Sequence, residues 1–240
     1  MEPAYGQAYE TLYREHWWWR AREEMLVEIL RGRQPTGGWR SILDVGCGNG
    51  LFFDRLSEFG EVEGVEFSGE LVSPNAPHAA RIHIGPFDAS FQPGKFYSLI
   101  LMLDVLEHLD RPGDALRHAL SLLDARGMVA ITVPAFLALW TSHDDLNQHR
   151  TRFTRSSFRA VAGTAGMKIL AERYFFHWMF PAKLAARAAG KLLGAKPAVP
   201  HVPAKWLNRT LYGISRAEQR LFRAAPLPFG SSLIVLGTHA

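Results

Sequence analysis

A glycine-rich segment is the part of this sequence whose residue types and spacing most clearly could support chemistry. An apolar run ends at Asp44, and three glycines follow two residues apart, at Gly46, Gly48 and Gly50. The pattern predicts a buried strand, a tight turn and then a helix from about Leu51. Glycine allows the unusual dihedrals and the close approach to a ligand that such a turn needs. At the carboxyl end of the first strand of an open α/β sheet, such a turn binds nucleotide-like cofactors.

The spacing of the glycines separates two classes of cofactor. A dinucleotide fingerprint is G-x-G-x-x-G, whereas this chain has G-x-G-x-G preceded by Asp44. A carboxylate beside the loop would repel a pyrophosphate but suits an ammonium group. The pattern D-x-G-x-G-x-G resembles motif I of the class I S-adenosylmethionine (SAM)-dependent methyltransferases. SAM carries an α-amino group, a carboxylate and a sulfonium but no phosphate, so the resemblance implies SAM as the cofactor.

Further acids follow where such a cofactor domain would place them. Glu66 ends a predicted strand 22 residues after Asp44, about the distance at which an acid binds ribose hydroxyls in both cofactor classes. A solvated glutamate at a strand end is the alternative. The resemblance puts Asp88 at the adenine amino group, with a turn aspartate as the alternative. The other residues that the resemblance implies at the cofactor are Gly46, Cys47, Gly48, Phe67, Ala89, Leu103, Asp104, His108 and Arg20.

The segment from Asp104 to Leu109 narrows the class of acceptor. It follows a continuous apolar run, 96–103, which predicts a central parallel strand covered on both faces. The string Asp-Val-Leu-Glu-His-Leu resembles the corresponding segment of small-molecule methyltransferases such as the ubiquinone-pathway enzymes. Enzymes of this fold that methylate DNA or protein amines carry an Asn/Asp-Pro-Pro-aromatic signature there, and this chain lacks it. The resemblance therefore argues against a nucleobase amine as acceptor.

A polar loop after the fifth predicted strand holds the candidate catalytic residues. The loop, 140–150, resembles a subgroup of bacterial methyltransferases with Ser-x-His-Asp followed by His-x-Arg-Arg-Tyr-Thr, although Phe153 replaces the tyrosine. Histidine is the usual base near neutral pH for a hydroxyl or acidic carbon acceptor. We expect His143 or His149 to be the base, oriented by Asp144, with His108 as a third candidate. A structural hydrogen bond is the alternative for each histidine.

The N-terminal segment is rich in aromatic residues that could face an acceptor. Tyr5, Tyr9 and Tyr13 are spaced for one helical face, and His-Trp-Trp-Trp-Arg follows at 16–20. Aromatic faces suit a sulfonium or an apolar acceptor. Either Arg20 or Arg22 could pair with the SAM carboxylate, and packing of the tryptophans onto the core is the alternative to a binding role. The residues that we expect at the acceptor are Tyr13, His16, Trp17 and Arg150. Arg150 and Arg152 could bind an acceptor carboxylate or phosphate, or could instead hold the loop against Asp144 or Asp145.

Basic residues gather late in the chain. Residues 176–230 contain nine Lys/Arg and one acid, Glu218. Lys183, Arg187 and Lys191 fit one amphipathic helix, and 207–221 suggests a second after a proline-rich break at 197–203. Such helices could cover the acceptor pocket as a lid or lie on an anionic membrane through 176–223, and we favour the lid. Nucleic-acid binding is not expected, because the aromatic residues sit among aliphatic ones.

Alternating strands and helices predict an α/β fold with a doubly wound, mostly parallel sheet. Strands are expected at 61–66, 80–84, 127–133, 167–175 and 232–237, and helices at 112–123 and 155–165. The resemblance implies a Rossmann-like, seven-stranded sheet whose last strand is antiparallel. The predicted parts are an N-terminal helical cap (1–38), the SAM-binding core (39–175), a basic helical insertion before the last strand (176–230) and that final strand (231–240).

The 240 residues suit one domain with additions. A single cysteine, Cys47, excludes an intramolecular disulfide and is compatible with a reducing compartment. No signal peptide is visible, and the longest apolar run, 128–140, is too short to span a bilayer. We therefore expect a cytoplasmic protein, with peripheral membrane contact as the alternative.

The predicted activity is SAM-dependent transfer of a methyl group to an oxygen or carbon of a small, apolar or amphipathic metabolite. One alternative is a methyltransferase for a lipid-linked substrate at the membrane surface. Another is a SAM-binding regulatory protein without catalysis. We expect no metal, because no tight cluster of metal ligands is evident in the sequence.

Overall fold

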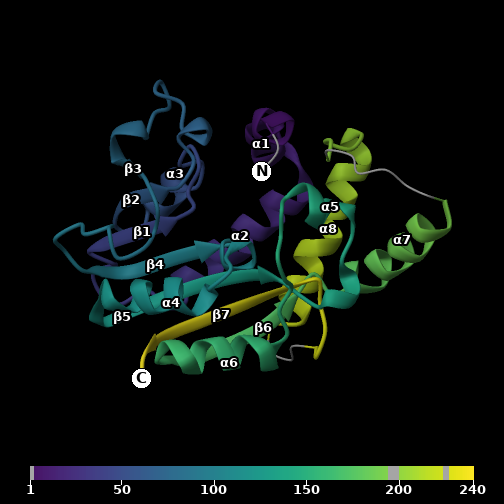
Figure 1. Cartoon of the computed structure of the whole chain (residues 1–240). Helices are drawn as coiled ribbons and strands as arrows, with labels where there is room; N and C mark the ends of the chain where they lie inside the picture. Colours follow the sequence, from purple (N-terminus) through teal and green to yellow (C-terminus); the bar gives the residue numbers. More distant parts are fainter. Residues whose placement is uncertain (1–2, 194–199, 224–226) are drawn as a thin grey trace.

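The computed structural model of the chain describes residues 3–193, 200–223 and 227–240 (Figure 1). Its described residues form one seven-stranded sheet in the order β3-β2-β1-β4-β5-β7-β6. Strands β1 to β5 run parallel, and β7 lies antiparallel between β5 and β6. This confirms the predicted α/β class and the antiparallel last strand. The strands are β1 (Ser41–Val45), β2 (Glu61–Glu66), β3 (Ile82–Ile84), β4 (Tyr97–Leu103), β5 (Leu123–Pro134), β6 (Met167–Phe175) and β7 (Ser232–His239).

The strand order reverses between β1 and β4, which lie side by side at the centre of the sheet. The chain passes from β1 toward β2 and β3 on one side, and then returns to add β4 and β5 on the other. In open α/β sheets the crevice outside the carboxyl ends of the strands at such a reversal is where ligands bind. The topology therefore places the glycine turn after β1 and the string after β4 at the same edge.

Two apolar cores form because side chains alternate across the strands. Leu43, Ile100 and Met102 belong to the core that includes helices α4 (Pro112–Ser121) and α6 (Arg155–Ala165). Ile42, Leu99 and Leu101 belong to the opposite core, which includes α2 (Trp17–Arg31) and α3 (Phe53–Leu56). Both faces of the central strands are thus covered, as the continuous apolar run of β4 predicts.

Three predicted elements differ in their limits. The helix expected from Leu51 begins only at Phe53 and spans four residues, because turns continue past Gly50. The third strand is shorter than expected, since residues Ala79–Arg81 form a 3-10 turn ahead of Ile82. The fifth strand begins earlier than expected, at Leu123, where it pairs with Tyr97 before a shift in register.

The segment before β7 contains two helices with different surroundings, α7 (Met179–Leu193) and α8 (Lys205–Leu221). Helix α8 packs along α2, with Ser215 and Glu218 buried. The Glu218 carboxylate accepts hydrogen bonds from the backbone N–H groups of His177 (2.8 Å) and Trp178 (2.6 Å). Helix α8 is therefore packed against the rest of the protein, which is not the position expected of a lid over the cavity.

The same helix also holds the corner between α1 (Pro3–Glu15) and α2. Asn208 accepts a hydrogen bond from the Trp17 N–H (2.9 Å) and donates one to the Glu15 carbonyl (2.8 Å). The His16 ring between them caps α2 by accepting a bond from the Trp18 N–H (3.1 Å). Helix α8 is thus joined to the corner between α1 and α2, although the two parts are distant in sequence.

Part of the predicted proline-rich break (197–199) lies outside the described residues, as do the side chains of Tyr5 and Lys191. The division of the chain into cap, core, insertion and final strand stays a prediction. Across the described residues, no helix has both the length and the apolar character needed to cross a membrane.

Candidate active site

A cavity of about 2440 Å³ opens at the carboxyl edge of the sheet. Its walls come from the ends of β1, β2 and β4, the α1–α2 corner, the loop after β5, and α7. Typical small-molecule pockets occupy roughly 300–1,000 Å³. The space is therefore large enough for a nucleoside cofactor and a second ligand together.

The glycine turn adopts the backbone conformation that its sequence predicts. Gly46, Gly48 and Gly50 all have positive φ angles, of 72°, 52° and 69°. A Cβ atom added at Gly46 would lie 2.9 Å from a methyl carbon of Val105. Any residue other than glycine would therefore be strained at position 46. Gly46, Cys47 and Gly48 line the cavity, where the missing side chains leave room for a ligand.

Glu66 is fixed beside this turn at the end of β2. Its carboxylate is buried and accepts hydrogen bonds from the backbone N–H groups of Gly48 (2.9 Å) and Ser68 (3.0 Å). Each oxygen still has a lone pair, so the carboxylate could accept two hydroxyl groups of a ribose. The exposed ring of Phe67 lines the cavity next to it.

Asp88 and Ala89 line the same end of the cavity. The Asp88 carboxylate accepts hydrogen bonds from the Ser90 hydroxyl (2.6 Å) and the Ser90 N–H (2.8 Å). Both bonds favour the ionised form and lower the pKa of Asp88. An acceptor for an exocyclic amine is thus available where the family resemblance implies one.

Asp44 is buried and is not among the residues that line the cavity. Burial raises the pKa of Asp44 to about 7, an effect that Arg22 opposes and Glu66 strengthens. The geometry therefore does not support the expected direct contact between Asp44 and the cofactor. The acid that does line the cavity nearby is Asp104, which has a positive φ of 58°.

Arg22, and not Arg20, reaches the cavity from α2. Its guanidinium pairs with Asp104 (2.7 Å) and donates to the Thr132 hydroxyl (2.8 Å), and that hydroxyl donates to Asp104 (3.0 Å). Arg20 lies over the ring of Tyr212 on α8, 4.9 Å from its centroid. Residues two apart point to different faces of a helix, so only one of the two arginines can face the site. The expectation for Arg20 is therefore corrected in favour of Arg22.

A similar correction applies to Tyr13. Its hydroxyl donates to Glu23 (2.5 Å), and the residue is not part of the cavity wall. Tyr9, one turn earlier on the same face, lines the cavity instead, as do His16 and Trp17. Trp17 also packs edge to face against Phe176, with ring centroids 6.1 Å apart, so it serves the core as well.

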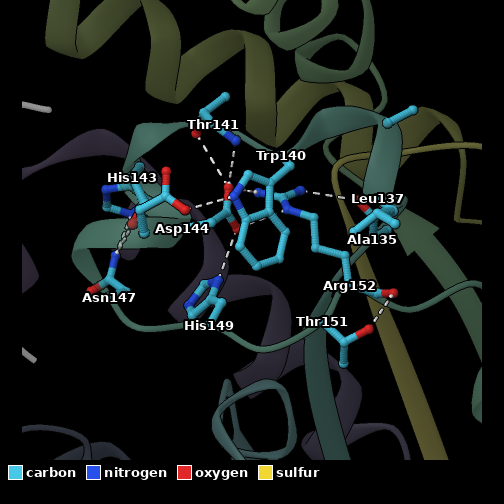
Figure 2. Close-up of polar contacts among 12 residues, drawn as sticks. Ala135, Leu137, Trp140, Thr141, His143, Asp144, Asn147, His149, Thr151 and Arg152 are labelled. Carbon is cyan, nitrogen blue, oxygen red and sulfur yellow. Dashed lines mark hydrogen bonds and ion pairs between the residues drawn. The ribbon is translucent and has the colours of Figure 1, made fainter. Parts of the chain in front are cut away.

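The loop after β5 is built around a buried carboxylate (Figure 2). Helix α5 (Ser142–Leu146) begins with a capping box, in which the Asp144 carboxylate accepts the Thr141 N–H at 2.8 Å. Arg152 binds the same carboxylate through Nε (2.8 Å) and Nη2 (3.0 Å), and His149 contacts it through Nδ1 (2.8 Å). Burial would raise the pKa of Asp144, but the hydrogen bonds from His149 and Arg152 outweigh it and hold the pKa well below its usual range.

This arrangement makes His149 a better candidate for the base than the other histidine of the loop, His143. With Nδ1 on Asp144, the proton of a neutral ring is held there, and Nε2 is left as an acceptor on a residue that lines the cavity. His143 also lines the cavity, and its ring bonds the side-chain amide of Asn147 (3.0 Å). Burial lowers the pKa of His143 to about 4, and Lys183 adds to the effect.

Next to His149 lies a second histidine and an isolated acid. The His108 and His149 rings meet edge to face with centroids 4.8 Å apart, and burial lowers the pKa of His108 to about 4. Glu107 is fully buried, and neither of its carboxylate oxygens has a hydrogen-bond partner among the described residues. Burial, reinforced by Asp104, raises the pKa of Glu107 well above its usual value.

Glu107, His108 and His149 could together hold a cation. One candidate ligand atom from each lies within 4.8 Å of the others. Imidazole and carboxylate groups are ligands for divalent metals. The sequence analysis treats the string around Glu107 only as a family resemblance, and it missed this cluster because His149 comes from a distant loop.

Arg150 is engaged at the rim of the cavity. It pairs with Asp110 (3.1 Å) and donates to the His108 carbonyl (3.3 Å). Of the two roles considered for it, the geometry favours holding the loop. Three polar residues that lie in or next to the cavity have no role at the site in the sequence analysis: Glu107, Thr132 and Lys183.

Three features are typical of the class I SAM-dependent methyltransferases. They are the parallel sheet with an antiparallel last strand, the glycine turn after β1, and Glu66 beside that turn at the carboxyl edge of the sheet. Residues 13–172 match the family described as "Methyltransferase domain". The chain belongs to this family and is a SAM-dependent methyltransferase.

Curated relatives match part of the chain. A ubiquinone biosynthesis O-methyltransferase from Caulobacter sp. (strain K31) is 33% identical over 122 residues, which cover 46% of this chain and 48% of the relative. A mitochondrial ubiquinone biosynthesis O-methyltransferase from Schizosaccharomyces pombe is 26% identical over 122 residues, or 46% of this chain and 43% of the relative. The chain thus spans about half the length of the curated relatives it matches.

Solved structures resemble the whole fold. A SAM-dependent methyltransferase from Archaeoglobus fulgidus has a TM-score of 0.57 at 18% identity, covering 90% of this chain and 93% of its own. The [4+2]-cyclase SpnF has a TM-score of 0.56 at 19% identity, covering 92% and 81%. At such identities the likeness concerns the fold alone. Because a cyclase shares the fold, the acceptor chemistry must be argued from the site.

Proposed function

We propose that the enzyme methylates a hydroxyl oxygen or an acidic carbon of a small, apolar or amphipathic acceptor, with His149 as the base. The observation that carries the proposal is the Asp144–His149 contact at 2.8 Å, in which a buried acid orients a histidine on the cavity wall. The O-methyltransferase activity named for the curated relatives supports the oxygen as target.

The residues of the cavity fit SAM at the end formed by β1 and β2. The Gly46–Gly48 turn leaves room for the ligand, Glu66 can accept ribose hydroxyls, and Asp88 can accept an amine. Bound there, SAM supplies an electrophilic methyl group on a sulfonium. The Arg22–Asp104 pair lies between this end and the acceptor loop and offers charges of both signs to an amino acid moiety.

The chain's contribution to the reaction is positioning and proton removal. The aromatic corner at His16 and Trp17 and the loop after β5 enclose the acceptor and keep water out. Holding two reactants in near-attack geometry can supply roughly 7–11 kcal/mol of the barrier. Nε2 of His149 takes the proton of the acceptor hydroxyl, and the Asp144 carboxylate stabilises the imidazolium that forms.

The test is turnover of methyl-labelled SAM with a panel of phenols, hydroxy acids and enolisable carbonyl compounds. Calorimetric titration with SAM, its demethylated product and NAD comes first, and binding of the first two alone is expected. With an accepted substrate, H149A should lose roughly 10²–10⁴-fold in kcat. The control is H83A, because His83 is exposed on β3 outside the cavity. Full turnover by H149A would contradict the proposed base.

A lipid-linked acceptor is the second candidate, favoured by the outer face of α8. Trp206, Ile214 and Leu221 are exposed there within one helical sector. Arg209 and Arg220 are exposed beside them. Aromatic and aliphatic side chains flanked by arginines suit the surface of an anionic membrane. Sedimentation with anionic vesicles tests this candidate: retention that is lost in W206S would support it, and no retention of the wild type would remove it.

A further inference from the structure

Helix α7 brings one cation to the acceptor end of the cavity. Lys183 lines the wall together with His143, Asn147 and Arg152. One turn later, Arg187 donates to the carbonyls of Leu137 (3.1 Å) and Ala138 (2.5 Å), in the turn that leads into the catalytic loop. Residues four apart share a helix face, so this anchor keeps Lys183 turned toward the site.

The acids around Lys183 are already engaged. Asp144 is bound by Arg152 and His149, and Asp104 is bound by Arg22. Glu107 is not among the groups whose charge acts on Lys183, which are Arg152, Asp144 and Asp104. Each of these two acids is thus paired with an arginine.

Lys183 is left without a counter-charge. Among the described residues it has no ion-pair or hydrogen-bond partner. Burial lowers the pKa of Lys183 to about 8, helped by Arg152 and opposed by Asp144 and Asp104, so the ammonium remains largely protonated at neutral pH. A half-buried ammonium group without a paired acid can donate charge-assisted hydrogen bonds to an anion that reaches it.

The arginines of the loop do not compete for this role. Arg150 is held by Asp110 and the His108 carbonyl, and Arg152 by Asp144 and the Ala135 carbonyl (3.0 Å). The unused positive charge on this wall therefore belongs to Lys183.

We propose that Lys183 binds an anionic group of the acceptor, so that the substrate is an organic acid whose carboxylate or phosphate lies against α7 while its nucleophilic atom faces His149. The inference rests on the proposed function, since it assigns the acceptor to this end of the cavity. It makes Lys183 a binding residue that selects the acceptor by charge.

The experiment measures binding, so that it does not depend on turnover. The protein is saturated with the demethylated product of SAM and titrated calorimetrically with 4-hydroxybenzoate, methyl 4-hydroxybenzoate and phenyl phosphate. The acid and its ester share ring and hydroxyl and differ in charge, whereas phenyl phosphate distinguishes a phosphate site from a carboxylate site. The variants are K183M and K183R, with K205M as the control because Lys205 is exposed on α8.

The wild type should bind at least one of the two anions more tightly than the ester. K183M should lower the affinity for that anion by about 10- to 100-fold, which is the usual effect of losing a hydrogen bond to a charged group. Its affinity for the ester should be unchanged. K183R should retain most of the preference, and K205M should match the wild type. Binding of the demethylated product should be equal in all four proteins.

Three outcomes would overturn the inference. They are equal binding of acid and ester by the wild type, an anion preference that survives in K183M, and no detectable binding of either anion. A loss of affinity for the demethylated product in K183M would also reject it, because Lys183 would then serve the cofactor. None of these results bears on the base: the proposed function fails separately, if H149A keeps full turnover.

Discussion

Asp144 and Arg152 form a two-bond ion pair in which neither side chain has more than a trace of contact with solvent. The pair closes the loop after β5 on itself, since the two residues are eight positions apart and each also binds a backbone group. The same carboxylate oxygen that receives Arg152 Nε also contacts His149. The candidate base is therefore oriented by an element that the loop also needs for its structure.

Removing the Asp144 charge should harm stability and catalysis together. D144N leaves Arg152 buried beside a neutral amide, and breaking a buried pair costs roughly 3–5 kcal/mol. Urea denaturation followed by tryptophan fluorescence measures the loss in the free energy of unfolding. D145N is the control, because Asp145 is exposed and bonds only Trp140 among the described residues. An unchanged unfolding midpoint in D144N would show that the pair is not a structural element.

Glu66 should govern cofactor affinity. E66Q keeps the size of the side chain but loses the charge that accepts hydrogen bonds, so affinity for SAM should fall roughly 10- to 100-fold. Calorimetry with SAM measures the effect, and E61Q, an exposed position on the same strand, should bind as the wild type does. Equal affinity in the two variants would place the ribose elsewhere.

The glycine turn should not tolerate a side chain. Alanine at position 46 must take a φ of 72° and approach Val105 to 2.9 Å, so G46A should lose roughly 1–3 kcal/mol of stability and much of its SAM affinity. G163A is the contrast: nothing lies within 4 Å of its Cβ on α6, and alanine favours helix by about 1 kcal/mol. In thermal denaturation, the melting temperature should fall in G46A and rise in G163A.

Three histidines whose pKa is lowered in the folded protein should each lose their contribution to stability as the pH falls. Burial lowers the pKa of His16, His108 and His143 to about 4, so all three are neutral in the folded protein above that pH. The unfolded chain takes up protons on them below about pH 6.5. The contribution of these three histidines to stability should therefore be constant above about pH 6.5 and decline as the pH falls to about 4. The pKa of Asp44, raised to about 7, has the opposite effect over the same range, so the histidines must be tested by substitution.

The measurement is the free energy of unfolding in urea across that range. H143N should flatten the decline, because it removes one group whose protonation favours unfolding, whereas H83N, at an exposed position on β3, should not. Equal slopes for the wild type and H143N between pH 6.5 and pH 4 would contradict the low pKa of His143.

The sequence predicts the sheet well because each element carries a local signal. The apolar run of β4, the glycines after β1 and the acid at Glu66 are all read from neighbouring residues, and the strand directions follow from the family resemblance. The pairing of Asp144 with His149 was also within reach, since both lie in one loop. Arg22 was weighed only as an alternative to Arg20, because spacing alone does not say which face of α2 meets the sheet.

What the sequence could not provide is contact between distant segments. Lys183 lines the cavity together with residues of the catalytic loop because the fold places α7 beside that loop. Glu107 lacks a hydrogen-bond partner among the described residues because the side chains that bury it offer none. The orientation of α8 could not be predicted for a similar reason. The sequence predicts a helix over 207–221, but it does not show that Ile214 and Leu221 are exposed while the polar Ser215 and Gln219 are buried.

The side-chain amide of Asn208 makes α8 a support for one wall of the cavity. It binds Glu15 and Trp17 on either side of the α1–α2 corner, and that corner carries Tyr9 and His16 on the cavity wall. The cavity-lining residues of this corner are therefore held in place from outside the site, by a helix that contributes none of the residues that line the cavity.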